Sequence, residues 1–358
     1  MKKACYLIAA FVFCLWLLFT VAGCDIHIGN ISQAKYQRTV EKQSPLETDS
    51  TLVVGTSSGS ITINGVDVSE CNVLAEITAR APTEQEAQEI AEQVFIILEK
   101  SDRTLTVRAD KPRLKNNRSI SISYDITVPR QTIVQCKSSY GALKLSNIDG
   151  DVNGKTSSGS IDAETIAGSV DLDTSYGSVT CLDVTGGDVK VKISSGQIKL
   201  SRASFGNCDL HTSYGSITAE QLDGDSVKLH SSSGSGNVVK ASVPAMDLFT
   251  SYGQITCRDI TVADIVAKTS SGGIDIECSN SSPSDMTANI VTSYGGIDFT
   301  APAGFSGQVE LGTNYGSVST DLPITISGQV SKKKITGMVG QGNGKVFLKT
   351  NSGSVRLK

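Results

Sequence analysis

The chain has few of the residues that build large cores and histidine-based centres. Aromatic residues make up 5% of the sequence, the only tryptophan is Trp16, and there are three histidines. A large globular core would have more aromatic surface than this to bury. There is also no P-loop, no His-Glu-x-x-His motif and no calcium-binding Gly-Gly-x-Gly-x-Asp nonapeptide. These absences favour a repetitive fold without catalysis, and we predict no catalytic residues, no metal and no cofactor.

Cysteines are present, but their positions argue against disulfides and zinc sites. Six follow Cys24 in the sequence, and none of them shows the C-x-x-C spacing of a zinc ligand pair. Cys181 and Cys257 hold the same place in a repeat. Four coils therefore separate them, or roughly 19 Å at the spacing of β-strands, too far for a disulfide. We expect these cysteines to be small buried hydrophobic residues, with Cys278 partly exposed.

A glycine turn that recurs every 18 or 19 residues is the strongest signal. A Ser or Asn, then Tyr or Ser, then Gly lies between two short runs in which apolar and polar residues alternate. Such alternation predicts strands with one buried face, and a unit this short must stack on its own copies. The sequence predicts an all-β fold, a parallel β-solenoid of about ten 18–19-residue coils with one N-terminal capping helix. The regularly spaced glycines are Gly141, Gly159, Gly177, Gly196, Gly215, Gly234, Gly253 and Gly272, followed by Gly295, Gly316 and Gly353, with Gly59 as an early outlier.

The middle residue of the turn alternates between Tyr and Ser, so the sequence alone also allows a coil of 37 or 38 residues. Outward charges favour the shorter coil: Asp171, Lys190, Asp209 and Lys228 would then stack with alternating sign, whereas the longer coil would place lysine on lysine. Uniform tyrosine columns would suit the longer coil. In either case, we expect Gly215→Val to destabilise the protein more than Gly353→Val at the chain's end.

The N-terminus has the pattern of an exported lipoprotein. Lys2 and Lys3 precede an apolar run, and Val21-Ala22-Gly23-Cys24 resembles the lipobox of bacterial lipoproteins, in which the cysteine is lipidated. We predict a signal peptide over 1–23 and anchoring through Cys24 on the periplasmic side or surface of a bacterial cell envelope. An uncleaved membrane anchor is the alternative.

Three further segments follow the predicted leader. We expect a flexible stalk over 24–49, an N-terminal cap over 50–131 with an inserted helix at 83–99, and solenoid repeats over 132–358. Thr83 and Glu86 form a capping box, and an apolar stripe follows them. The run Lys332-Lys333-Lys334 is interpreted as a solvated turn.

These features together resemble the bacterial putative-adhesin family, a β-strand-repeat domain of unknown function related to head domains of presumed surface adhesins. The resemblance covers roughly 50–358. It is carried by the lipobox, the helix after Ser57-Ser58-Gly59-Ser60-Ile61, the Ser-Tyr-Gly or Ser-Ser-Gly array, and the closing Thr350-Asn351-Ser352-Gly353-Ser354-Val355. It implies a β-solenoid at the cell envelope and a non-enzymatic role, and it supplies no catalytic residues.

Two outward columns are candidate sites. His211 and His230 fall in one column of adjacent coils and could approach within about 5 Å, either as a metal-binding pair or as part of an ordinary polar ladder. The tyrosines would lie along one edge in every second coil, about 9.6 Å apart. They could bind a glycan or a protein partner, or simply cover the glycine turns. They are Tyr140, Tyr176, Tyr214, Tyr252, Tyr294 and Tyr315.

The sequence therefore predicts a lipid-anchored envelope protein that binds or adheres without catalysis. Two alternatives stay open: a structural or envelope-stress component acting through a protein partner, and a polysaccharide-active β-helix enzyme. The formal charge of −4 falls to about −6 when Lys2 and Lys3 leave with the leader (30 basic minus 36 acidic residues). This charge gives no basis for nucleic-acid binding. The expected partners are the membrane, through the anchor, and a glycan or envelope protein.

Overall fold

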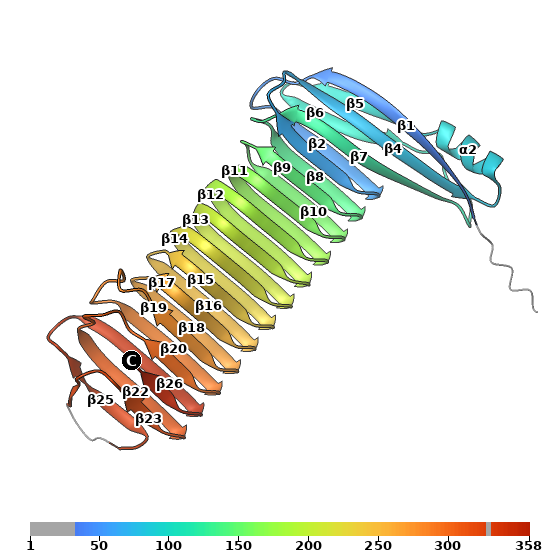
Figure 1. Ribbon diagram of the computed structural model, residues 1–358. Coiled ribbons are helices and arrows are strands. Elements are labelled where there is room, and N and C mark those ends of the chain that lie inside the picture. Colours follow the sequence, from blue (N-terminus) through green and yellow to red (C-terminus); the bar gives the residue numbers. More distant parts are fainter. Residues whose placement is uncertain (1–32, 327–330) are drawn as a thin grey trace, which may run out of the picture.

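The protein is an elongated stack of β-strand coils with one cap at its N-terminal end (Figure 1). The computed structural model describes residues 33–326 and 331–358. In these ranges all strands join one hydrogen-bonded system, and a single helix accompanies them. The predicted fold class, a parallel β-solenoid with a helix in its N-terminal part, is confirmed.

The N-terminal part contains the first coil, the cap and the helix. Its elements are β1 (Ala34–Pro45), β2 (Thr51–Ser58), β3 (Ile61–Val66), β4 (Glu70–Ala81), α2 (Glu84–Glu92), β5 (Phe95–Ser101), β6 (Thr104–Asp110) and β7 (Ser119–Pro129).

The regular array follows, and several of its strands run from one coil into the next. They are β8 (Ile133–Tyr140), β9 (Leu143–Ile148), β10 (Val152–Ser158), β11 (Ile161–Tyr176), β12 (Val179–Ser195), β13 (Ile198–Tyr214), β14 (Ile217–Ser233), β15 (Gly236–Ser242), β16 (Ala245–Tyr252), β17 (Ile255–Thr261), β18 (Asp264–Ser271) and β19 (Ile274–Cys278).

The C-terminal part completes the stack. Its strands are β20 (Thr287–Tyr294), β21 (Ile297–Thr300), β22 (Gly307–Tyr315), β23 (Val318–Thr320), β24 (Thr325–Ile326), β25 (Lys334–Val339), β26 (Gly344–Ser352) and β27 (Val355–Leu357).

The strand register settles the length of a coil. Val152 pairs with Val170 and Val170 pairs with Val189, both in parallel, so each coil of the regular array advances by 18 or 19 residues. Asp171 pairs with Lys190, which pairs with Asp209, as the alternating charges predicted. The 18–19-residue coil is therefore correct, and the 38-residue coil is not.

Each coil is flat, with inward side chains from its two strands meeting in a thin core. Leu172 and Thr174 precede one glycine turn, Val179 and Cys181 follow it, and all four are buried. Small and medium side chains fill this gap at the usual separation of about 10 Å between packed sheets. The low aromatic content of the sequence follows from this geometry.

The glycine turns pack backbone against backbone between coils. A Cβ added to Gly215 would lie 1.8 Å from the Gly196 carbonyl oxygen, so no larger residue fits there without a shift. In most coils a buried hydroxyl two residues before the tyrosine or serine of the turn donates to the same kind of glycine carbonyl one coil away, whereas Ile193 holds this position before Ser195. Examples are Thr250 to Gly234 at 2.9 Å and Thr292 to Gly272 at 3.0 Å. This hydroxyl ladder satisfies carbonyls that would otherwise be buried without a donor.

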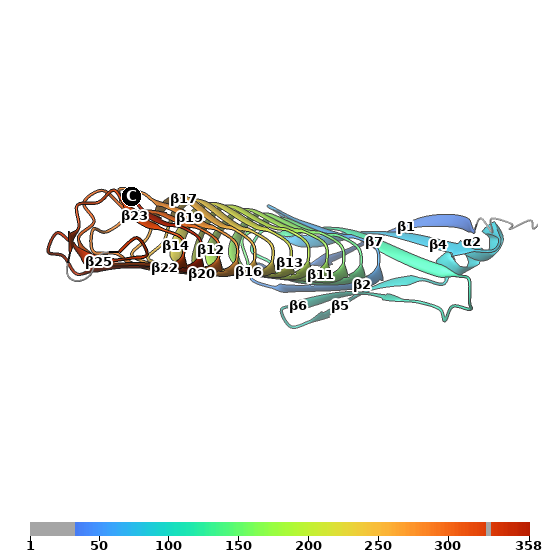
Figure 2. The ribbon, with the colours of Figure 1, turned by 90° about the horizontal axis from the view of Figure 1, so that it is seen from below.

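The cap is a segment inserted in the chain after the first coil. β2 and β3 stack directly on β8 and β9, and the intervening chain returns as β6 against β2 and β7 against β3. β4 extends this layer from β7, and β1 extends it from β4 (Figure 2). The outermost core and edge of the stack are thereby covered, as solenoids require.

Two predictions about this cap are wrong in part. Ala34–Pro45, placed in the flexible stalk of 24–49, forms β1 and pairs antiparallel with β4 over its whole length. The helix predicted over 83–99 begins as expected, with the Thr83 hydroxyl accepting from the Glu86 N–H, but it ends at Glu92. Phe95–Ser101 is strand β5 because its β-branched and apolar residues pair with β6.

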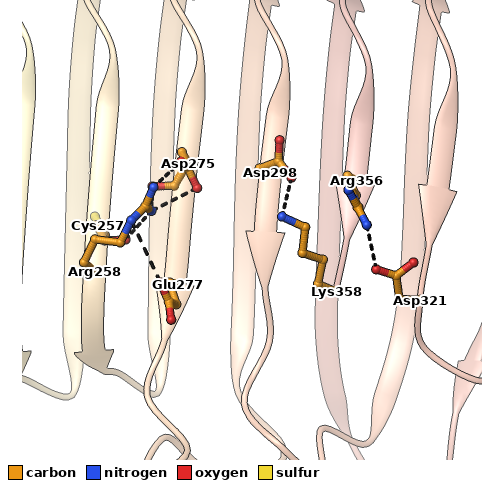
Figure 3. Close-up of polar contacts among 8 residues, drawn as sticks. All are labelled: Cys257, Arg258, Asp275, Glu277, Asp298, Asp321, Arg356 and Lys358. Carbon is orange, nitrogen blue, oxygen red and sulfur yellow. Dashed lines mark hydrogen bonds and ion pairs between the residues drawn. The ribbon is translucent and has the colours of Figure 1, made fainter.

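The C-terminal strands enter the stack out of chain order. β26 lies between β20 and β22, and β27 lies between β21 and β23. Ion pairs hold the inserted β27 on both sides: Lys358 with Asp298 and Arg356 with Asp321, each at 3.0 Å (Figure 3). The end of the chain is therefore an interior coil rather than a frayed terminus.

Candidate ligand-binding face

The six tyrosines of the turns form one exposed row along the stack. Each ends the first strand of its coil, just before the glycine turn, and each is between 64% and 72% exposed. Packing over the turns thus covers only about a third of the surface of each tyrosine. The row consists of Tyr140, Tyr176, Tyr214, Tyr252, Tyr294 and Tyr315.

The row keeps its two-coil period even where chain order would break it. Tyr294 and Tyr315 belong to coils that follow each other in the sequence, so a stack built in chain order would make them neighbours. Instead, the inserted strand β26 places Ser352 between them, paired with both. Tyrosine and serine consequently alternate from Tyr140 to Tyr315 over ten strand steps, about 48 Å at about 4.8 Å per step.

A polar column accompanies the tyrosine row. The residue before each tyrosine or serine of the turn is serine in the regular coils and asparagine in the last two, where the Asn314 amide donates to the Asn351 oxygen at 2.7 Å. These side chains are the outward neighbours of the tyrosines on the same strands. The face therefore offers aromatic rings next to hydrogen-bonding groups along its whole length.

The two histidines of the candidate pair stack on each other and on a phenylalanine. The ring centroids of His211 and His230 are 4.8 Å apart, and those of His230 and Phe249 are 4.6 Å apart. Burial, and then the neighbouring charges of His230 and Lys192, hold the pKa of His211 below its usual range. The described residues contain no group of three or more potential metal ligands. The contacts present are those of an aromatic ladder.

A basic pocket lies at the C-terminal end of the tyrosine row. It has a volume of about 640 Å³ and is lined by Tyr315, Asn314, Lys333, Lys334 and Lys349, among others. The lysine run that was interpreted as a solvated turn thus contributes to a pocket. The sequence could not show this, because Lys349 reaches the pocket only through the inserted strand β26.

The cysteines from Cys71 onward are buried and free. Burial raises the pKa of the Cys136 and Cys181 thiols to about 12. Cys278 was expected to be partly exposed, but it is 6% exposed because it lies inward in β19. These thiols are protonated and enclosed, as suits core residues.

One sequence motif matches the spacing of a serine-hydrolase motif but has a different structure. Gly55 to Gly59 match the spacing Gly-x-Ser-x-Gly, but Ser57 lies in a strand that turns into another strand, and the serine-hydrolase elbow requires a strand that turns into a helix.

Cys24 and the predicted signal peptide lie outside the described residues. Among the helices that are described, none is long and apolar enough to cross a membrane.

The chain belongs to the Toastrack DUF4097 family, whose model matches residues 77–301 and 187–358. The fold and the expected resemblance to a putative-adhesin family agree with this membership. A search of curated proteins found no match.

Three solved structures are similar to this chain at low sequence identity. A putative adhesin from Bacteroides fragilis is 16% identical, with 71% of this chain and 97% of that chain covered and a TM-score of 0.29. A putative cell adhesion protein from Clostridium sporogenes is 11% identical, with 90% and 99% covered and a TM-score of 0.20. A putative lipid binding protein from Parabacteroides distasonis is 13% identical, with 91% and 97% covered and a TM-score of 0.35.

Proposed function

We propose that this protein is a lipid-anchored binding protein of the bacterial cell envelope that holds a linear ligand along the tyrosine row without transforming it. The observation that carries the proposal is the exposed row with its constant two-coil period. If the alternation of tyrosine and serine came only from an ancestral two-coil repeat, it would follow the order of the chain. The alternation instead follows the order of the stack, because β26 enters out of chain order and places Ser352 between Tyr294 and Tyr315. Selection for the assembled surface explains this arrangement.

The row suits a polysaccharide in particular. Tyrosine rings offer flat apolar faces on which pyranose rings stack, and their hydroxyls remain available for hydrogen bonds. The neighbouring serines and asparagines supply further donors and acceptors to sugar hydroxyls. A spacing of about 9.6 Å between rings is comparable with two linked sugar units, so successive tyrosines would meet equivalent units of one chain.

The same surface supports binding better than turnover. Side chains on the outward columns point away from a flat strand surface, and the described residues of the row gather no nucleophile, base and charge stabiliser around one point. The lipid anchor at Cys24 would hold the stack at a membrane, with the tyrosine row displayed along its length.

Affinity electrophoresis of the full chain in detergent, through gels containing single polysaccharides, tests the proposal. The wild type should be retarded by at least one polymer, and a Tyr176, Tyr214 and Tyr252 triple Ala variant should lose that retardation. A matched control replaces Thr180, Thr218 and Thr256 with Ala, since these lie in the second strands of the same coils, facing outward on the opposite surface. Equal retardation of wild type and tyrosine variant would contradict the proposal, as would turnover of the polymer.

A further inference from the structure

The pocket at the end of the tyrosine row is open because one outward side chain is missing. Gly312 occupies the outward position of β22 that corresponds to Lys349 of β26. A Cβ built on Gly312 meets no atom within 4 Å, so the space above it is empty. Tyr315 and Lys349 both line the pocket that contains this space.

The pocket has an excess of positive charge. Three lysines and Glu310 line it, which gives a formal charge of +2 (three minus one). Lys334 pairs with Glu310 at 3.2 Å. Lys333 and Lys349 have no carboxylate within ion-pair distance in residues 33–326 and 331–358. Two ammonium groups are therefore free to bind an anion.

The turn that presents Lys333 is fixed before any ligand arrives. The Thr313 N–H donates to the Lys333 carbonyl at 2.9 Å, and the Val318 N–H donates to the Lys332 carbonyl at 3.0 Å. The Ser331 hydroxyl accepts from the Lys333 and Lys334 N–H groups. The Lys333 ammonium lies 5.8 Å from the centroid of the Tyr315 ring. A preorganised site of this kind loses less entropy on binding.

Two lysines of the same outward column, Lys155 and Lys192, differ from Lys349 in having a carboxylate opposite them. Asp173 faces Lys155 and Lys192 across the strands, so those lysines have a carboxylate beside them. Lys349 has Val291 on one side and Gly312 on the other. Lys137 and Lys268 of this column likewise face no carboxylate across the strands, but neither lines this pocket. At the end of the tyrosine row, Lys349 lies in the same pocket as Lys333.

We propose that this pocket binds a carboxylate group of an acidic polysaccharide whose sugar rings lie along the tyrosine row. The inference rests on the proposed function and specifies its ligand class. A sugar ring stacked on Tyr315 would direct its carboxylate into the space above Gly312, between the Lys333 and Lys349 ammonium groups. Charge-assisted hydrogen bonds to both are the strong contacts of the site.

The test compares polygalacturonate with its fully methyl-esterified form, which has the same backbone without the charges. The full chain in detergent should bind polygalacturonate more tightly, with an affinity that falls as salt rises. The Lys333→Gln, Lys349→Gln double variant should bind it about tenfold more weakly, equivalent to about 1.4 kcal/mol. A control with Lys144→Gln and Lys199→Gln, exposed lysines on the opposite surface, should leave the affinity unchanged.

A second pair of variants separates charge from shape. Gly312→Asp and Gly312→Asn add side chains of equal size into the open space, so both should fold. Gly312→Asp should bind polygalacturonate about tenfold more weakly than Gly312→Asn does, because only Gly312→Asp adds a negative charge. Equal binding by these two variants would overturn the pocket's role.

The outcomes distinguish this inference from the proposed function. If the methyl-esterified polymer binds through the tyrosines as well as polygalacturonate does, the pocket inference fails and the proposed function stands. If neither these polymers nor others are retained, both fail. If vesicles of phosphatidylglycerol bind through Lys333 and Lys349 while polygalacturonate does not, the anion belongs to a lipid and the inference is overturned.

Discussion

Substituting alanine at Gly215 tests the stacked-coil geometry at a single atom. Its Cβ would lie 1.8 Å from the Gly196 oxygen and 2.7 Å from the Gly196 carbonyl carbon, and Gly215 has a φ of +152°. Backbone strain costs about 1–3 kcal/mol, and overpacking adds about 1–3 kcal/mol. We expect Gly215→Ala to lower the free energy of unfolding by about 2–6 kcal/mol.

Gly312→Ala is the matched control, because its Cβ meets nothing within 4 Å and its φ lies outside the left-handed region. It should leave stability within about 0.5 kcal/mol or raise it slightly. Urea unfolding followed by circular dichroism at the β-sheet band measures both variants. Equal midpoints for Gly215→Ala and Gly312→Ala would refute the close approach of neighbouring coils.

The same geometry corrects the expectation that Gly353→Val is milder than Gly215→Val. Gly353 lies in the inserted coil, and its Cβ would be 2.1 Å from the Gly295 oxygen. The chain end is not a frayed end, so both substitutions should be severe.

Four further predictions follow from particular contacts. Thr250→Val leaves the Gly234 carbonyl without its hydroxyl donor and should cost about 0.5–1.5 kcal/mol in a urea titration, with a change below about 0.3 kcal/mol contradicting the ladder. The cysteines from Cys71 onward should react with a thiol reagent at pH 8 only after unfolding, since burial holds pKa values such as that of Cys136 at about 12; rapid native labelling would contradict their burial. Because the pKa of His211 is lowered on folding, the unfolded state binds the proton more readily, so stability should decrease as pH falls through the ordinary value of 6.5, and His211→Phe should reduce that decrease. Labelled palmitate should enter the wild type but not Cys24→Ser, and equal labelling would exclude the anchor.

Periodicity made most of the fold predictable. The glycine spacing and alternating apolar residues fix the coil and its inward face, and the charges of Asp171, Lys190 and Asp209 favoured the correct coil length. The helix was predicted too long because the apolar residues from Val94 to Leu98 fit both a helical stripe and a buried strand. Tertiary pairing with β6 decides between them.

Other features of the structure could not be predicted, because the local sequence does not indicate them. A left-handed residue recurs in successive coils, at Asn147, Thr165, Asp183 and Arg202 among others, but the residue types share no turn preference. The out-of-order insertion of β26 was hidden because its Asn351-Ser352-Gly353 triplet looks like one more coil. The basic pocket depends on that insertion, so sequence order could not bring Lys333 and Lys349 together.

The most direct test of the central claim is the affinity of the full chain for oligosaccharides of increasing length, cut from the polymer that it retains. The tyrosine row predicts that affinity rises with length as more rings are engaged, and that Tyr214→Ala weakens long oligomers more than short ones. An affinity that stays constant from the shortest oligomer onward, or that is indifferent to Tyr214, would contradict a linear ligand held along the row.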